Sequence, residues 1–181
     1  MTHTAHMNKF LFFSITLFTS CSFGNESGII TYAQEHLRQT GILKNTNGFV
    51  YLDINDNYIF DLVPLIQETG FKSPPYFGKE GLVGAHISVI FPDELNDIEI
   101  DECGEEFSFR LMNCIAIAPE QYKGLIKFYL LIVEAPELNS LREKYGLEKS
   151  EHNFHITIGL KQKCPLTLDA SGHFQTMNSL D

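Results

Sequence analysis

Two short segments of this chain combine a histidine with a hydroxyl side chain two positions later. They read His-Ile-Ser at 86–88 and His-Ile-Thr at 155–157. Both are flanked by β-branched residues, which favour strands. Because residues i and i+2 of a strand project from the same face, each segment presents one imidazole and one hydroxyl together. The isoleucine between them is expected to face the core.

Two such pairs facing one another would suit metal-independent cleavage of a phosphodiester. One neutral imidazole takes a proton from the attacking hydroxyl or water, and a second, protonated imidazole gives one to the departing ribose oxygen. His86 and His155 suit these roles because imidazole titrates near neutral pH. The pattern leaves open which of them is the base. Ser88 and Thr157 are expected to donate hydrogen bonds to the non-bridging phosphate oxygens.

The segments HISV at 86–89 and HITI at 155–158 resemble the paired motifs of the 2H phosphoesterase superfamily. That group includes RNA 2′,5′-phosphodiesterase/ligase proteins and 2′,3′-cyclic nucleotide phosphodiesterases. The resemblance covers most of residues 48–160. It implies an α+β fold that is bilobal, with pseudo-twofold antiparallel sheets and flanking helices around a central cleft.

The resemblance also implies the roles of individual residues. His86 and His155 would be catalytic, Ser88 and Thr157 would bind the substrate phosphate, and no cofactor would be needed. Tyr76, in the loop before the first motif, is a candidate substrate contact because it can stack on a base or reach a phosphate. Its other interpretation is a loop anchor. The implied substrate is a 2′,3′-cyclic phosphate or a 2′,5′-phosphodiester in a small nucleotide or short oligonucleotide.

The elements that position these motifs follow the same order twice: a strand, a helix and the motif strand. Hydrophobic periodicity and turn residues predict strands over 48–54, 85–91, 107–118, 124–135 and 154–160. The same signals predict helices over 27–40, 57–69 and 137–146, and a loop over 71–84. Pro64 is expected to kink the second helix or to divide it into two pieces. The repeated order suggests an internal duplication.

Composition sets limits on the partners. The 181 residues are 44% hydrophobic, which suits one folded domain and excludes a disordered chain. The formal net charge of −10 disfavours binding of long nucleic acid or of an anionic membrane surface. A small anionic ligand stays possible, since it needs only one favourable pocket. We expect a monomer.

The N-terminal segment has the layout of a signal peptide. An apolar run, FLFFSITLF at 10–18, follows Lys9 and precedes Thr-Ser-Cys. We therefore expect residues 1–20 to direct export to the periplasm or cell envelope. Cys21 is a candidate lipidation site, and such a lipid would be the only membrane contact. The alternatives are cleavage without lipidation and an N-terminal helix of a cytoplasmic protein.

This division leaves three further segments. A helical lead-in is expected over 22–47, the phosphoesterase-like domain over 48–165 and a C-terminal tail over 166–181. The cysteines at 103, 114 and 164 lack metal-ligand spacing and can form at most one disulfide within the domain.

Two other functions fit the same residues. One is an exported lipoprotein that binds a nucleotide or phosphate without catalysis. The other is a metal-dependent hydrolase that uses His86, His152 and the acidic segment 93–106. A histidine pair three residues apart on one strand faces opposite sides, which disfavours a metal shared by His152 and His155.

Overall fold

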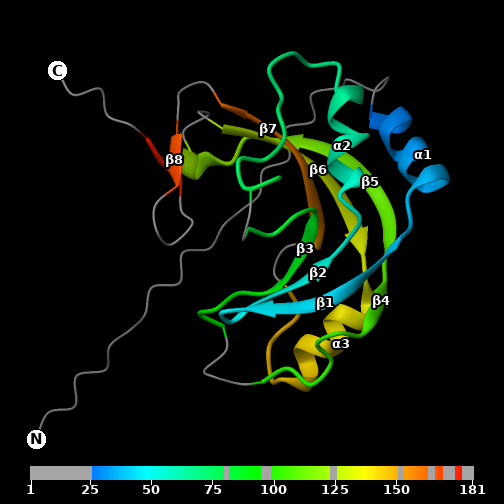
Figure 1. Cartoon of the computed structure of the whole chain (residues 1–181), viewed down its shortest axis with the longest axis vertical. Coiled ribbons are helices and arrows are strands. Elements are labelled where there is room, and N and C mark those ends of the chain that lie inside the picture. Colours follow the sequence, from blue (N-terminus) through cyan, green and yellow to red (C-terminus); the bar gives the residue numbers. More distant parts are fainter. Residues whose placement is uncertain are drawn as a thin grey trace, which may run out of the picture.

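One antiparallel sheet organises the part of the chain that the structure describes, which comprises residues 26–79, 82–94, 99–122, 126–150, 153–162, 166–168 and 174–176. In this computed structural model, seven strands lie in the order β4-β1-β2-β3-β7-β6-β5 (Figure 1). A separate pair, β8 and β9, lies outside this sheet. Every pair of neighbouring strands is antiparallel.

The element bounds follow the predicted pattern in most places. The strands are β1 (Thr40–Thr46), β2 (Phe49–Asp53), β3 (His86–Ile90), β4 (Glu106–Ser108), β5 (Arg110–Ile117), β6 (Ile126–Glu134), β7 (His155–Gln162), β8 (Leu166–Leu168) and β9 (Phe174–Thr176). The helices are α1 (Glu26–His36), α2 (Asn57–Phe60) and α3 (Pro136–Lys144), with 3-10 turns η1 (Val63–Leu65) and η2 (Glu120–Tyr122).

The helix expected over 27–40 is found as α1, whereas residues 40–46 of the expected helical lead-in form the strand β1. The helix α1 ends at His36, and Gln39 then binds β5: its carbonyl accepts from Phe109 N at 3.0 Å, and its side-chain Oε1 accepts from Leu111 N at 2.9 Å. The chain continues as β1, which pairs with both β2 and β4. The segment before β2 thus contributes a strand to the sheet as well as a helix.

A tight hairpin joins β1 to β2. Asn47 and Gly48 both have positive φ, 52° and 84°, which is the backbone of a type I′ turn. The side-chain oxygen of Asn45 accepts a hydrogen bond from Gly48 N at 3.0 Å. This turn fixes the register of β2, the strand that lies next to the first histidine motif.

The helix expected over 57–69 is divided, as Pro64 predicts. Its first turn forms α2, and Pro64 lies at the start of the separate turn η1. Proline has no N–H to donate to the carbonyl four residues earlier, and its ring collides with that turn. The remaining residues of the predicted helix are irregular, so the chain bends here toward the loop that carries Tyr76.

The helices α1 and α3 pack against opposite parts of the sheet. The helix α1 contacts β5, and α3 contacts β3 and β4 (Figure 1). Ile29 and Ala33 of α1 and Leu138 and Leu141 of α3 are buried. They belong to one core cluster that also includes the buried isoleucines of both motif strands.

The fold is thus α+β, as expected, with a single continuous seven-stranded sheet. The predicted signal peptide and Cys21 lie outside the described residues. Within the described residues, no helix is long and apolar enough to cross a membrane.

Candidate active site

The strands that carry the two motifs are neighbours at the centre of the sheet. β3 and β7 are antiparallel and pair with Ile87 opposite Ile156. Both isoleucine side chains are fully buried. Because successive strand residues alternate between faces, the residues on either side of them project from the other face of the sheet. The predicted orientation of both motifs is therefore confirmed.

Four polar side chains meet on that second face. The antiparallel pairing puts His86 across from Thr157 and Ser88 across from His155. All four side chains are half-buried. The two histidines occupy diagonal positions, which lie about 7–8 Å apart in antiparallel sheets. A single phosphate group can bridge such a gap.

Both imidazoles are oriented by the backbone in the same way. His86 Nδ1 lies 2.8 Å from the carbonyl oxygen of Gly84, and His155 Nδ1 lies 3.1 Å from that of Asn153. A carbonyl oxygen only accepts hydrogen bonds, so Nδ1 carries the proton in each ring. In the neutral ring, Nε2 is then the nitrogen that can take a proton from a substrate or from water.

The surroundings of His86 favour its neutral form. Burial lowers the pKa of His86, and the charge of His155 lowers it further. The hydrogen bond to Gly84 and the carboxylate of Asp53 oppose this change without reversing it. His155 thus lies close enough for its charge to disfavour the protonated form of His86.

Tyr76 lies beside both motifs. Its ring centroid is 5.5 Å from that of His86, and its hydroxyl hydrogen-bonds with the Thr157 side chain. Burial raises the pKa of Tyr76 to about 12, so the phenol stays protonated at neutral pH. The structure thus brings the candidate substrate contact from the loop to the four strand residues.

Backbone and aromatic contacts hold the loop of Tyr76 in this position. At its start, Lys72 and Leu160 exchange two backbone hydrogen bonds, of 3.0 and 2.9 Å, so that the loop is tied to β7. Next to Tyr76, the ring of Phe77 packs edge-on against Phe60 with centroids 4.8 Å apart. The loop therefore connects α2 to the strand of the second motif.

The neighbouring strand β2 adds residues that sequence reasoning missed. Asp53 pairs with His86, and Tyr51 pairs with Ser88, so their side chains share the face of the site. The rings of Tyr51 and Phe49 lie edge-on to His86, with centroid distances of 5.9 and 5.8 Å. The β-branched and aromatic residues of FVYLD at 49–53 predict a strand, but nothing in the sequence indicates that this strand lies next to β3.

Asp53 is also bound by a lysine from β1. Lys44 Nζ lies 2.5 Å from Asp53 Oδ2, and this ion pair raises the pKa of Lys44. Lys44 pairs with Tyr51 in the sheet, two strands away from the first motif. It is a cation on the same face as the histidines, and the motifs alone give no sign of it.

The backbone before His86 is held by Asp56. Its Oδ1 accepts a hydrogen bond from Ala85 N at 2.8 Å. A Cβ at Gly84 would lie 2.4 Å from this same oxygen, so only glycine leaves room for the carboxylate. Since the Gly84 carbonyl orients the imidazole, Asp56 and Gly84 together position His86.

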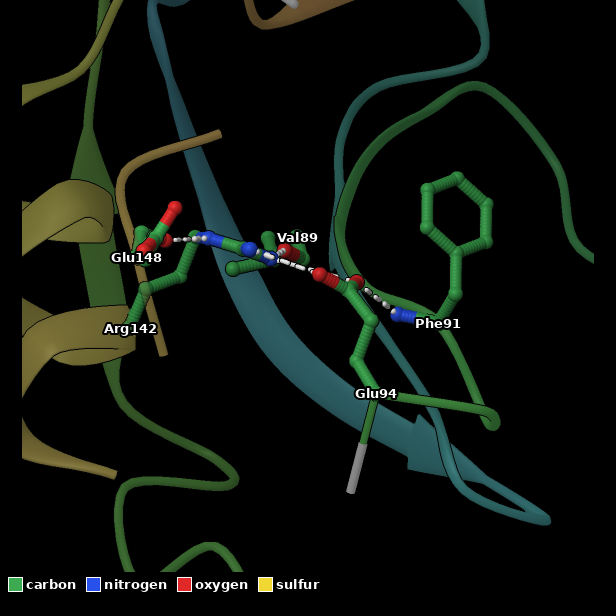
Figure 2. A network of polar contacts seen from close by, with 5 residues as sticks. All are labelled: Val89, Phe91, Glu94, Arg142 and Glu148. Atoms are coloured by element: carbon green, nitrogen blue, oxygen red, sulfur yellow. Dashed lines mark hydrogen bonds and ion pairs between the residues drawn. The ribbon is translucent and has the colours of Figure 1, made fainter. Parts of the chain in front are cut away.

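The chain after β3 is held by a buried arginine (Figure 2). Arg142 of α3 forms an ion pair with Glu94 at 2.6 Å and donates to the carbonyl oxygens of Val89 at 2.7 Å and Glu148 at 2.9 Å. Glu94 Oε2 accepts from Phe91 N at 2.8 Å. The exposed Phe91 ring is held 5.9 Å from Phe49, so aromatic side chains continue from His86 toward solvent.

Other candidates are not joined to this site. His152 and Cys21 lie outside the described residues. Cys103 is exposed and Cys114 is buried, and both are free thiols. In the part of the chain that the structure describes, no group of three or more His, Cys, Asp or Glu side chains could hold a metal ion.

Comparison with known proteins shows the family of this chain. The family described as "Swiss Army Knife, 2H phosphoesterase domain" matches residues 50–164, which is more than half of the chain. The matched region contains both histidine motifs and Tyr76. No curated protein and no solved structure matches the chain.

Proposed function

Since this chain belongs to the 2H phosphoesterase family, we propose that it is a phosphodiesterase in which His86 and His155 act as an acid–base pair. The proposed substrate group is a 2′,3′-cyclic phosphate or a 2′,5′-phosphodiester. The observation that carries the proposal is the pairing of β3 with β7, by which both imidazoles lie on one face of the sheet. Each ring is oriented in the same way, by a hydrogen bond from Nδ1 to a backbone carbonyl two residues earlier.

His86 is the proposed base. Burial lowers its pKa, so the neutral imidazole, with a free lone pair on Nε2, persists to lower pH than for an ordinary histidine. His155 is then the acid, because the reaction needs one group of each kind. In the reverse step the two would exchange roles.

The hydroxyl groups serve the phosphate. Ser88 and Thr157 stand between the histidines in the pairing and can donate to the non-bridging oxygens. Tyr76, hydrogen-bonded with Thr157, supplies a further neutral donor or orients the Thr157 hydroxyl. Neutral donors of this kind stabilise charge on the phosphate without requiring a metal.

In the proposed hydrolysis, water attacks phosphorus and the two histidines transfer the protons. The oxygen of water forms a new bond to phosphorus, and its proton passes to His86 Nε2. The bond from phosphorus to the ribose oxygen breaks, and that oxygen takes a proton from His155. The products are a phosphomonoester and an alcohol, and both histidines return to their starting states by exchanging protons with water.

The charge of the chain favours a small substrate. The net charge of −10 repels a long polyanion, whose affinity depends on many cationic contacts. On the site face, Lys44 is partly neutralised by Asp53. We therefore propose a nucleotide or short oligonucleotide.

The test is turnover of a 2′,3′-cyclic nucleotide in the presence of EDTA. His86→Ala and His155→Ala are each expected to lower kcat by about 10²–10⁴-fold, the usual contribution of a positioned acid or base. The matched control is His36→Ala, since His36 stacks on Tyr32 at the end of α1, outside the motifs. This control is expected to keep the wild-type rate.

Three results would overturn the proposal in different ways. Undiminished activity in both variants would remove the acid–base roles. Activity that EDTA abolishes and a divalent ion restores would favour a metal-dependent hydrolase. Saturable nucleotide binding with no turnover of cyclic or linear substrates would favour a binding protein.

A further inference from the structure

A groove of about 380 Å³ lies next to His155, between the end of β6, the start of α3 and the segment before β7. It combines polar with apolar side chains and is lined by Met112, Ile132, Asn139, Lys149, Ser150 and Asn153. Neither histidine lines it, and neither motif predicts it.

The groove begins at the direct neighbours of His155. Ile132 pairs with His155 across β6 and β7, so the two side chains share one face of the sheet. The carbonyl of Asn153, another lining residue, accepts the hydrogen bond from His155 Nδ1. A ligand bound to the groove would thus reach the His155 side of the phosphate.

The other side of the histidine pair has a different character. Phe49 and Tyr51 lie edge-on to His86, and the exposed Phe91 continues this aromatic surface. The site is therefore flanked by aromatic rings next to His86 and by the mixed groove next to His155. A cyclic mononucleotide has one nucleoside and can use only one of these flanks.

The groove has the chemistry of a nucleoside site. The amides of Asn139 and Asn153 can both donate to and accept from base edges or ribose hydroxyls. Ile132 and Met112 offer apolar surface to a ring, and a volume of this size suits a small-molecule site. Lys149 supplies a cation.

The charges at the groove leave this cation available. Glu134, which also lines the groove, forms an ion pair with Arg110 of β5, so its negative charge is compensated. Lys149 Nζ lies 3.7 Å from Glu143 Oε1, and both side chains are largely exposed. Such a pair is weak and exchanges readily for a ligand.

We propose that this groove binds the departing nucleoside of a linear phosphodiester, a group that a cyclic mononucleotide lacks. The inference rests on the proposed function, in which His155 protonates the leaving oxygen. In an in-line displacement the base and the acid act on opposite sides of phosphorus, so the departing nucleoside lies on the side of His155. The attacking water enters from the side of His86.

The experiment compares two substrates of the purified chain: 2′,5′-linked diadenosine monophosphate and adenosine 2′,3′-cyclic phosphate. Asn139→Ala and Lys149→Ala are each expected to lower kcat/KM for the linear substrate by about three- to tenfold, as loss of one hydrogen bond does. Ser150→Phe, which fills the groove, is expected to lower it further. All three are expected to change kcat/KM for the cyclic substrate less than twofold.

Matched controls come from α3, the helix that carries Asn139. Lys144→Ala removes an equal charge from α3, where Lys144 pairs with Glu102, and Ser140→Ala changes the residue after Asn139. Both variants are expected to keep the wild-type kcat/KM for each of the two substrates. Thermal unfolding of each variant shows whether a loss of rate comes from loss of folded protein.

The outcomes separate this inference from the proposed function. Turnover of the linear substrate with a selective loss in the groove variants supports it. Equal effects on both substrates, no effect on either, or wild-type turnover of the cyclic substrate alone would overturn it and leave the acid–base pair standing. If the wild type cleaves neither, the proposed function falls and the inference falls with it.

Discussion

The imidazoles of His86 and His155 each donate their Nδ1–H to a backbone carbonyl oxygen. A carbonyl takes no proton, so each ring keeps its Nδ1–H in both charge states, and only Nε2 changes. The tautomer is therefore fixed before substrate binds. Nearby charges and burial then decide the pH range in which each ring is neutral.

Asp53 gives a direct test of this at the residue scale. Its carboxylate raises the pKa of His86, against the larger lowering by burial. Asp53→Asn removes this attraction. It also removes the carboxylate that compensates Lys44, and an uncompensated ammonium on the same face repels the charged imidazole. The pKa of His86 is thus expected to fall further, which moves the acidic limb of the kcat/KM profile to lower pH.

The measurement is kcat/KM against pH for wild type and Asp53→Asn, with Glu137→Gln on the exposed start of α3 as the control. The control is expected to keep the wild-type profile. An acidic limb that stays in place or moves to higher pH in Asp53→Asn would show that a group other than His86 sets it.

Sequence reasoning predicted the residues of the two motifs but not their neighbours. His86, Ser88, His155 and Thr157 carry a spacing that a strand translates directly into a shared face. Asp53 carries no such mark, because its place beside His86 depends on the pairing of β2 with β3. Pairing between distant strands is decided by the whole sheet, and a local pattern does not contain it.

At the element scale, the strands were predicted better than the connections between them. The motif strands and β6 were predicted within a few residues, because runs of β-branched and aromatic residues end at clear turns. The strand β1 was missed although Asn47-Gly48 marks a hairpin, because its sequence TGILKNT has only two large apolar residues, side by side, and no alternation. Its place in the sheet is set by pairing with β2 and β4, which a local pattern does not contain.

Arg142 shows how one element positions another. This nearly buried arginine ties α3 to the end of β3, to the turn at Glu94 and to the chain leading toward β7. Arg142→Met keeps the packing of the stem but removes the guanidinium, so Glu94 and two carbonyls lose their donor. We expect the free energy of unfolding to fall by about 2–3 kcal/mol, below the range for a fully buried pair because water reaches Glu94.

The pH dependence of this loss follows from Glu94. Arg142 lowers the pKa of Glu94, so the stability from this pair is present above the ordinary glutamate value of 4.5 and is lost as pH falls through the folded pKa. Urea unfolding at pH 7 and at pH 3 is therefore expected to show a smaller difference between wild type and Arg142→Met at pH 3. An equal difference at both values would assign the effect to the lost hydrogen bonds with the Val89 and Glu148 carbonyls rather than to the ion pair.

At the scale of the whole molecule, the seven-stranded sheet consists of two sets of strands that meet at β3 and β7. The paired positions of these strands are Ile87 and Ile156, both fully buried. Their side chains fill the core directly beneath the proposed catalytic face. The joint between the two sets is thus also the support of the site.

A cavity beneath the paired strands β3 and β7 is expected to lower the free energy of unfolding. Ile156→Ala should lower the free energy of unfolding by about 2–5 kcal/mol, the usual cost of truncating a buried isoleucine. The control Ile117→Ala, at the half-exposed end of the edge strand β5, should cost less than about 1 kcal/mol. Urea unfolding of both variants measures the two losses in free energy of unfolding. Similar losses would contradict the expectation that packing beneath β3 and β7 contributes more to stability than the edge of β5.

The arrangement of the strands within the whole sheet could not be predicted from the sequence. Two similar strand–helix–strand units suggested two lobes, but the order of strands in the sheet and the position of Tyr76 depend on contacts between segments far apart in the chain. Lys72 binding Leu160 is one such contact, and it brings the loop of the first unit onto the strand of the second. Neither residue carries a local signal for it.

The pairing of Ile87 with Ile156 also bears on which changes of chain length this fold can accept. A shift of one residue in either strand would turn its histidine and hydroxyl into the core and its isoleucine toward the substrate. Insertions or deletions inside β3 or β7 would therefore remove the whole proposed site at once.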